Sequence, residues 1–142
     1  MNKGQDHLAV LLLGSNLGKS EENLLKAISI LEKKVGRIER KSGVLFSEPV
    51  DFASDYIFCN IAVNIRTESS PIALLNRIKE IERSMGRLRD SAFYNEHRDR
   101  IIDIDIVFFD GIIFESKKLN LPHSKHLERG FSRRLLMNIG VL

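Results

Sequence analysis

The sequence predicts a ferredoxin-like α+β fold, in which an antiparallel sheet carries two helices on one of its faces. Three observations predict it. The 142 residues suit a single domain spanning 1–142. Apolar residues recur with strand and helix periods in the order β-α-β-β-α-β, and serine, proline and glycine stand where those segments begin and end. The other face of the sheet is expected to stay open for a ligand, with short additions at the C-terminal end.

The first three elements are expected within residues 7–46. Residues 7–13 are almost wholly apolar and predict a short buried strand. A helix follows, with Ser20 as the expected N-cap and Gly36 as the expected stop. Its apolar positions recur at helical spacing: Leu24, Ile28, Leu31 and Val35. Residues 38–46 are the second expected strand.

The next strand and helix have clearer patterns. Apolar side chains occupy every second position of residues 57–65, which predicts a strand with one apolar face. Ser70 is the expected cap of the second helix and Pro71 its first residue. That helix is expected to end at Gly86, after apolar residues at helical spacing: Leu74, Ile78, Ile81 and Met85.

The last strand of the predicted sheet spans residues 101–109. Asp110 and Gly111 predict a tight turn from it into a short partner strand at residues 112–115. Residues 122–142 have a mixed pattern and are expected to be partly helical.

Composition restricts the class of function. A net charge of +3 suits an anionic ligand but does not by itself indicate nucleic acid. Cys59 is the one cysteine, which excludes an internal disulfide and a cysteine-based zinc site, and we expect it to be a small buried side chain. No stretch approaches the length of a membrane span, and the N-terminal residues lack a secretory pattern. A cytoplasmic protein without a membrane partner is the resulting expectation.

The stretch LLLGSNLGKS, residues 11–20, nearly matches the Walker A signature of a phosphate-binding P-loop. Walker A places four residues between its glycines, whereas three separate Gly14 from Gly18. Because the loop wraps phosphate with a fixed number of backbone N–H groups, the missing residue disfavours this interpretation. A P-loop-type nucleotide binder is therefore kept only as an alternative.

The stretch RIIDIDIVFF, residues 100–109, carries the clearest chemical signal. Side chains alternate along a strand, so Asp103 and Asp105 are expected on one face, about 6.6 Å apart. Carboxylates so placed in an apolar strand repel each other unless a cation joins them. Mg²⁺ prefers carboxylate oxygens together with substrate phosphates. The solvent-facing side of an amphipathic strand is the simpler explanation, and the strand alone leaves both open.

Basic residues favour the phosphate interpretation. Seven of them precede the acidic strand: Arg77, Lys79, Arg83, Arg87, Arg89, Arg98 and Arg100. Guanidinium groups beside a carboxylate pair suit a polyphosphate carrying Mg²⁺. The rival interpretation is contact with an RNA backbone, but a ferredoxin-like RNA-binding domain should carry an aromatic RNP1 pattern, which is absent. A small phosphate-rich molecule is therefore favoured over nucleic acid.

Two further residues are candidates for ligand contacts. Asn60 falls on the polar side of the 57–65 alternation, where a flat heterocycle with an amide edge would satisfy its donors and acceptors, and Phe58 and Phe131 could sandwich that ring. An ordinary, partly hydrated asparagine near the end of a strand is the alternative. His123 follows Pro122, and a lone histidine is more often structural than catalytic.

Together these residues resemble a known family, the 6-hydroxymethyl-7,8-dihydropterin pyrophosphokinases of folate biosynthesis. The resemblance runs from the first strand to about residue 135. Four elements carry it: LLLGSNLG, FCNIAVNI, MGRLR, and RIIDIDIVFF followed by LPHSKHLERGF. In that family the opening Gly-Ser-Asn is a turn at the end of a strand beside the pterin.

The resemblance implies transfer of pyrophosphate from ATP to the hydroxymethyl group of the dihydropterin, with release of AMP. It implies that Asp103 and Asp105 hold two Mg²⁺ ions and that Arg87, Arg89 and Arg100 surround the triphosphate; these five are the implied catalytic residues. Further ATP-side positions are Lys79, Glu82, Arg98, Ile106, Lys118, Asn120, His123, Ser124 and Arg129. The implied pterin pocket comprises Asn16, Ser47, Val50, Phe58, Asn60, Asp103 and Phe131.

The chain departs from the family pattern in one loop and at its tail. The family usually has Trp-Gly-Pro-Arg before its first aspartate, whereas this chain has His-Arg-Asp-Arg at residues 97–100, in a loop about three residues longer. Tyr94, Phe93 and His97 are the candidates for the missing aromatic, and the tail is shortened. We expect a monomer that acts on small molecules; a ferredoxin-like ligand- or RNA-binding module without catalysis is the alternative.

Overall fold

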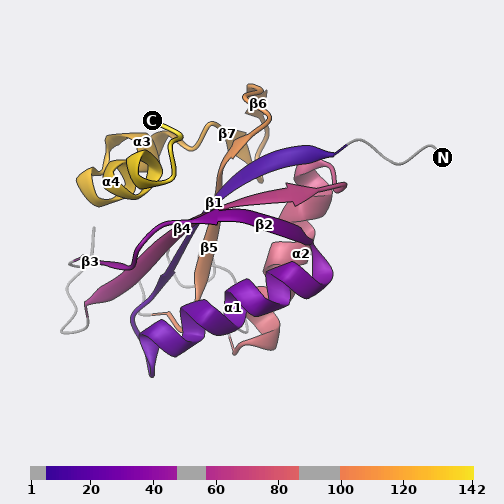
Figure 1. The fold of residues 1–142 in the computed structure, drawn as a ribbon. Helices are drawn as coiled ribbons and strands as arrows, with labels where there is room; N and C mark the ends of the chain where they lie inside the picture. Colours follow the sequence, from indigo (N-terminus) through magenta and orange to yellow (C-terminus); the bar gives the residue numbers. More distant parts are fainter. Residues whose placement is uncertain (1–5, 48–56, 87–99) are drawn as a thin grey trace.

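The computed structural model describes residues 6–47, 57–86 and 100–142, and it has the predicted ferredoxin-like α+β architecture (Figure 1). Antiparallel strands form the main sheet in the order β2-β4-β1-β5, with β3 also paired to β4. The elements are β1 (His7–Ser15), α1 (Ser20–Lys34), β2 (Gly36–Lys41), β3 (Leu45–Ser47), β4 (Phe58–Thr67), α2 (Pro71–Ser84), β5 (Asp103–Phe109), β6 (Phe114–Glu115), β7 (Asn120–Leu121), α3 (Ser124–Glu128) and α4 (Gly130–Asn138).

The two faces of the sheet are covered by different helices. Helices α1 and α2 pack on one face, where alternate residues of β1 and β4, with Ile104, Ile106 and Phe109 of β5, join the main core. On the other face, α4 packs its apolar side against β1, β4 and β5 (Figure 1). This second cluster comprises Val10, Leu12, Ala62, Val107, Leu135, Leu136 and Ile139. The expectation that the second face is open is therefore wrong for its central part, because Leu135, Leu136 and Ile139 cover it.

Of the two predicted helix N-caps, the one for α2 is confirmed and the one for α1 is wrong. Ser70 caps α2, with its hydroxyl accepting a hydrogen bond from Ala73 N at 3.3 Å, and Pro71 begins the helix as expected. At α1 the expected cap is wrong, because Ser20 is the first helical residue and Lys19 the N-cap, without a side-chain capping bond. Asn23 instead ties the preceding turn, since its Nδ2 donates to Leu17 O at 2.9 Å and to Ser15 Oγ at 3.2 Å.

The strand predicted for residues 38–46 is split into β2 and β3. Ser42, between them, donates its backbone N–H to Ala62 O at 2.9 Å, and its hydroxyl accepts from Ala62 N at 2.9 Å. A side-chain oxygen thus replaces a main-chain carbonyl in the pairing with β4, and the strand breaks there. Asn138 Oδ1 of α4 also accepts from Gly43 N at 3.1 Å, which joins the break to the C-terminal helix.

The turn after β5 forms as predicted, but its expected partner strand is wrong. Asp110 and Gly111 have positive φ values of 52° and 69°, and Ile112 N donates to Phe109 O at 3.0 Å. The chain then leaves the sheet, and β6 pairs with β7 in a separate two-stranded ribbon. The tail beyond it is partly helical, as expected.

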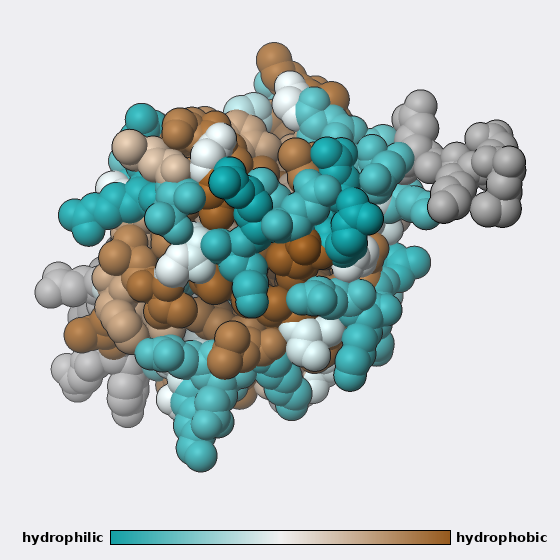
Figure 2. Space-filling model, in the orientation of Figure 1, coloured by the Kyte–Doolittle hydropathy of each residue, from teal (hydrophilic) through white to brown (hydrophobic). Residues whose placement is uncertain are grey.

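Figure 2 shows apolar atoms gathered in the middle of one face of the molecule, among polar side chains. Within the part of the chain that the structure describes, we find no helix with both the length and the apolar character needed to cross a lipid bilayer.

Candidate active site

The site is built on a row of residues that crosses three neighbouring strands. Gly14 of β1 pairs with Asn60 of β4 on one side and with Asp103 of β5 on the other. Two residues before Gly14 on β1, Leu12 lies between Ala62 and Asp105 in the same way. Strands lie about 4.8 Å apart, so the backbones at Asn60 and Asp103 are separated by about 10 Å. The sheet thereby places an amide and a carboxylate on one face, two residues beyond Leu12 and Ala62 of the cluster under α4.

Gly14 keeps the middle of this row open. A Cβ atom at this position would lie 3.1 Å from Asn60 Oδ1 and 3.4 Å from a ring carbon of Phe58. A side chain here would therefore crowd the Asn60 amide and the Phe58 ring. Glycine avoids this crowding and allows a close approach to the backbone.

Asn60 is held in one orientation. Its side chain is 6% exposed, and its Nδ2 donates to Ser47 Oγ at 2.8 Å and to Leu45 O at 3.0 Å. Both acceptors belong to β3, so the short strand fixes the amide. Its donors are thus used within the protein, while its carbonyl oxygen lies on the side of Gly14. A hydrated asparagine at a strand end would not be buried to this extent.

The two aspartates of β5 share the site's face as the alternation predicts. Their side chains are 22% and 31% exposed, while Ile102, Ile104 and Ile106 are buried in the core. Arg100 Nη1 donates to Asp103 Oδ2 at 3.3 Å. The carboxylates therefore remain accessible from solvent on a largely buried strand.

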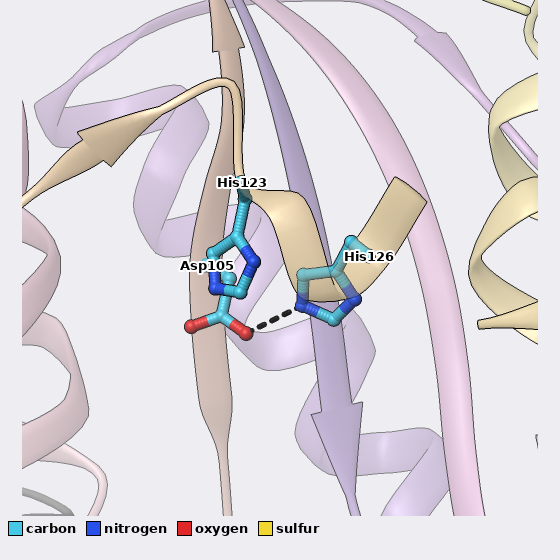
Figure 3. A group of neighbouring side chains, drawn as sticks. All are labelled: Asp105, His123 and His126. Atoms are coloured by element: carbon cyan, nitrogen blue, oxygen red, sulfur yellow. Dashed lines mark hydrogen bonds and ion pairs between the residues drawn. The ribbon is translucent and has the colours of Figure 1, made fainter. Parts of the chain in front are cut away.

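Asp105 has a partner that sequence reasoning missed. His126 Nε2 lies 2.7 Å from Asp105 Oδ2 (Figure 3). His126 Nδ1 lies 2.7 Å from Ser132 Oγ. His126 is 5% exposed and Ser132 is fully buried. Burial acts to raise the pKa of Asp105, but the His126 hydrogen bond and the charges of His126, His123 and Arg100 hold it below its ordinary value. No spacing signal pointed to His126, because the contact depends on how α3 docks on β5.

His123 lies beside this pair. Its backbone N–H donates to Val107 O at 3.0 Å, which ties the residue to β5, and its ring centroid is 4.4 Å from that of His126. Burial lowers the pKa of His123, and the charges of His126 and Arg129 add to the effect, against Asp105, which raises it. The sequence placed His123 on the ATP side, and the structure brings it to the aspartate face.

Asn16 joins the end of β1 to the start of β5. Its side chain is 3% exposed, its backbone N donates to Arg100 O at 2.9 Å, and its Oδ1 accepts from Arg100 N at 2.7 Å. These two hydrogen bonds anchor Arg100, whose guanidinium lies beside Asp103. It also uses the Asn16 N–H that a P-loop would need for phosphate, while the Lys19 side chain is 82% exposed. The Gly-Ser-Asn segment is thus a strand-to-helix turn, and this geometry argues against the P-loop alternative.

The remaining ATP-side candidates differ in burial and in the partners that the structure gives them. Glu82 is buried in α2, where its Oε2 accepts from Ile104 N at 2.8 Å. Ile106 is 2% exposed in the core, so a ligand could reach it only through the main chain. Asn120 Oδ1 accepts from Ser116 N at 3.2 Å. The others are more accessible: Lys79 and Arg129 are partly exposed, and Lys118 and Ser124 are exposed.

Several predicted site residues lie outside the described residues: Val50, Phe93, Tyr94, His97, Arg87, Arg89 and Arg98. Of the pterin-side candidates, Phe58 and Ser47 stand at the edge of the Asn60 row, and Phe131 is half-buried in α4. Their stacking and binding roles stay predictions.

The fold and the site define a class: a ferredoxin-like α+β domain with a buried amide and a pair of partly exposed carboxylates on one face of its sheet. A family model described as 7,8-dihydro-6-hydroxymethylpterin-pyrophosphokinase matches residues 10–141. The chain belongs to this family of folate-biosynthesis pyrophosphokinases.

Individual relatives agree. The chain is 36% identical over 133 residues to the 2-amino-4-hydroxy-6-hydroxymethyldihydropteridine pyrophosphokinase of Porphyromonas gingivalis, covering 93% of this chain and 90% of that protein. It is also 36% identical over 126 residues to the folic acid synthesis protein FOL1 of Dictyostelium discoideum, covering 89% of this chain but spanning only 18% of that longer protein. A crystal structure of wild-type Plasmodium falciparum HPPK-DHPS with pterin and p-hydroxybenzoate matches the whole chain and 42% of its own, with a TM-score of 0.72 at 19% identity. That likeness supports the fold.

Proposed function

We propose that this protein transfers pyrophosphate from ATP to the hydroxymethyl group of 6-hydroxymethyl-7,8-dihydropterin and releases AMP. The observation that carries the proposal is the row Asn60–Gly14–Asp103, which sets an oriented amide and a carboxylate on one face of the sheet in a chain of the pyrophosphokinase family. The amide suits the acceptor, and the carboxylates suit the nucleotide. Both substrates would then meet on this face of the sheet.

The pterin end is proposed to lie over Gly14. The Asn60 carbonyl oxygen would accept from a ring N–H or amino group of the heterocycle, because its own amide donors are held by β3. Phe58 and Phe131 would stack on the ring, with Asn16, Ser47 and Val50 around it. The Asn16 bonds to Arg100 would make this end rigid before substrate arrives.

The carboxylate pair fits Mg²⁺. Asp103 and Asp105 supply accessible carboxylate oxygens on adjacent same-face positions, which is the donor set that hard divalent cations prefer. We propose that they hold two Mg²⁺ ions together with ATP. Bound there, Mg²⁺ would neutralise charge on the triphosphate oxygens.

The residues of this chain are proposed to align the two substrates and to neutralise the negative charge of the phosphates. The hydroxyl of the pterin is a weak acid, and negative oxygens shield the β-phosphorus of ATP. Arg100, fixed by Asn16, would present its guanidinium to the phosphoryl group, with Arg87, Arg89 and Arg98 proposed to approach from other sides. His123, Ser124 and Arg129, with Lys79, Glu82, Ile106, Lys118 and Asn120, are proposed to meet the rest of the nucleotide. A strong general base is not required, because positioning supplies most of the rate enhancement.

One assay tests the proposal. The purified protein is incubated with ATP and Mg²⁺, with and without the hydroxymethyl-dihydropterin, and AMP is separated and quantified. We expect AMP to form only when the pterin and Mg²⁺ are both present. Binding of pterin or RNA without any AMP would instead support the non-catalytic module. Action as a monomer in the cytoplasm stays a prediction of the sequence.

A further inference from the structure

A second set of possible metal ligands overlaps the carboxylate face. Asp105, His123 and His126 each offer one ligand atom, and these atoms all lie within 4.8 Å of one another (Figure 3). Asp105 comes from β5, His126 from α3, and His123 from the residue before α3. The set is distinct from the paired aspartates, because two of its three donors are imidazole nitrogens.

The surroundings of His126 resemble those of a metal-bound histidine. Such a ligand binds its metal through one ring nitrogen and donates its other N–H to an oxygen that fixes the ring. Ser132 Oγ, fully buried and 2.7 Å from His126 Nδ1, supplies that oxygen. Because a hydroxyl can donate or accept, Ser132 suits both tautomers of the ring. With the Nδ1–H donated to Ser132, the Nε2 lone pair faces the side of Asp105.

One ring nitrogen of His123 lacks a hydrogen-bond partner among the described residues. This atom is Nδ1, and it is buried. An unpaired buried ring nitrogen costs free energy, and an ion bound through it would remove that cost. Its burial beside His126 thus points to a ligand as well.

The distances allow an ion after small side-chain movements. Donor atoms about 2.1 Å from an ion lie about 3.0 Å apart in octahedral and about 3.4 Å apart in tetrahedral geometry. His126 Nε2 and Asp105 Oδ2, now 2.7 Å apart, would separate by a few tenths of an ångström. His123 would approach by a rotation of its side chain, since its backbone is fixed by the bond to Val107.

We propose that Asp105, His123 and His126 form a binding site for a transition-metal ion of the Zn²⁺, Co²⁺ or Ni²⁺ type, with Ser132 orienting His126. Imidazole nitrogens favour such ions, whereas Mg²⁺ prefers oxygen donors. The site shares Asp105 with the proposed magnesium pair but does not depend on nucleotide. Its ion would bind to the nucleotide-free protein, so this proposal and the pyrophosphokinase proposal can be tested separately.

The test uses Co²⁺ as probe with full-length, tag-free protein and without ATP or pterin. Visible absorption of Co²⁺ reports its coordination, and titration gives the stoichiometry and Kd. We expect one Co²⁺ per chain with nitrogen-ligand spectra, and an increase in Kd of at least tenfold in both His126→Gln and His123→Gln. Glutamine approximates the size of histidine, but its amide is a poor ligand for Co²⁺.

The control is His7→Gln. His7 also pairs with an aspartate, Asp110, at the far end of β1 from Gly14, so this variant removes an Asp–His pair outside the cluster. Its Co²⁺ titration should match that of the unmodified protein. Circular dichroism checks the fold of each variant; if His126→Gln unfolds, His123→Gln decides. No saturable binding, or binding unchanged by the folded cluster variants, overturns the proposal. Either result leaves the AMP assay unaffected, so the two proposals fail separately.

Discussion

At the residue scale, the two aspartates of β5 have different partners although they are two positions apart. Asp103 faces a guanidinium, and Asp105 faces an imidazole that a buried serine holds. A guanidinium stays charged at all physiological pH values, whereas an imidazole can also act as a neutral donor. The partners of the two aspartates therefore differ before any ligand binds, and Asp103 lies in the same row as Gly14 and Asn60.

Replacing either aspartate is expected to abolish most of the activity without unfolding the protein. Asp103→Asn and Asp105→Asn keep the size of the side chain but remove the charge that is proposed to hold Mg²⁺. We expect turnover to fall by about a hundredfold or more, because charge neutralisation supplies a large part of the rate. Steady-state AMP release measures it, with circular dichroism as the control. Near-normal release by a folded Asp103→Asn protein would contradict the metal assignment.

Asp110 predicts a pH dependence of stability. Burial acts to raise its pKa, but hydrogen bonds from Leu8 N and His7, with the charges of His7 and Arg66, outweigh this and lower it. A lowered pKa stabilises the fold above the unfolded value of about 4, and the gain is lost as the pH falls through the folded value.

The variant Asp110→Asn should show this loss, because asparagine also tolerates the positive φ of 52°. At pH 7 we expect its free energy of unfolding to be lower by up to about 1 kcal/mol, since solvent screens a side chain that is a third exposed. Urea titrations at pH 7 and about pH 3 measure the difference, which should shrink at the lower pH. An equal difference at both values would exclude the electrostatic explanation.

At the element scale, β2 depends on a close approach at its first residue. A Cβ atom on Gly36 would lie 1.8 Å from Arg66 O, a backbone atom that cannot move without breaking the pairing with β4. The sequence identified this glycine as a helix stop, whereas its role is to let β2 begin beside β4 directly after α1.

Gly36→Ala is therefore expected to lower the free energy of unfolding by about 3 kcal/mol, in the upper range for overpacked sites. Gly43→Ala is the matched control, because a Cβ there meets nothing within 4 Å, and we expect a change below about 0.5 kcal/mol. Urea unfolding of both variants measures the contrast. Equal stabilities would show that β2 can shift away from β4 at little cost.

The sequence predicted those features that depend on only a few residues close together in the chain. The cap at Ser70 and the alternation around Asp103 and Asp105 are of this kind, and both are confirmed. The split at Ser42 depends on a hydroxyl that pairs with Ala62, twenty residues away. His126 was missed for the same reason, since its contact with Asp105 arises from tertiary docking of α3.

At the scale of the whole molecule, the helices divide the sheet by function. Helices α1 and α2 pack on one face, and α4 packs on the middle of the other. The Asn60–Gly14–Asp103 row lies two residues further along the strands than Ala62 and Leu12, which belong to the cluster under α4. The proposed ligand-binding residues are thus carried by paired strands.

The reactivity of Cys59 reports how readily the core between the sheet and helices α1 and α2 opens to solvent. The thiol is fully buried, and burial, with the charge of Glu21, raises its pKa to about 11. At pH 8 we expect a thiol reagent to react at least about a hundredfold more slowly with native than with urea-unfolded protein, because the thiolate is scarce and reaction requires opening. Absorbance of the released chromophore gives both rates. Similar rates would indicate that the core opens readily.

The central claim is that Asp103 and Asp105 hold magnesium against the ATP phosphates beside a pterin pocket at Gly14. A crystal structure of the protein with Mg²⁺, a non-hydrolysable ATP analogue and the pterin tests it most directly. We expect two ions about 2.1 Å from oxygens of both carboxylates and of the triphosphate, with the ring beside Asn60. Phosphates bound elsewhere, with both carboxylates free of metal, would contradict it.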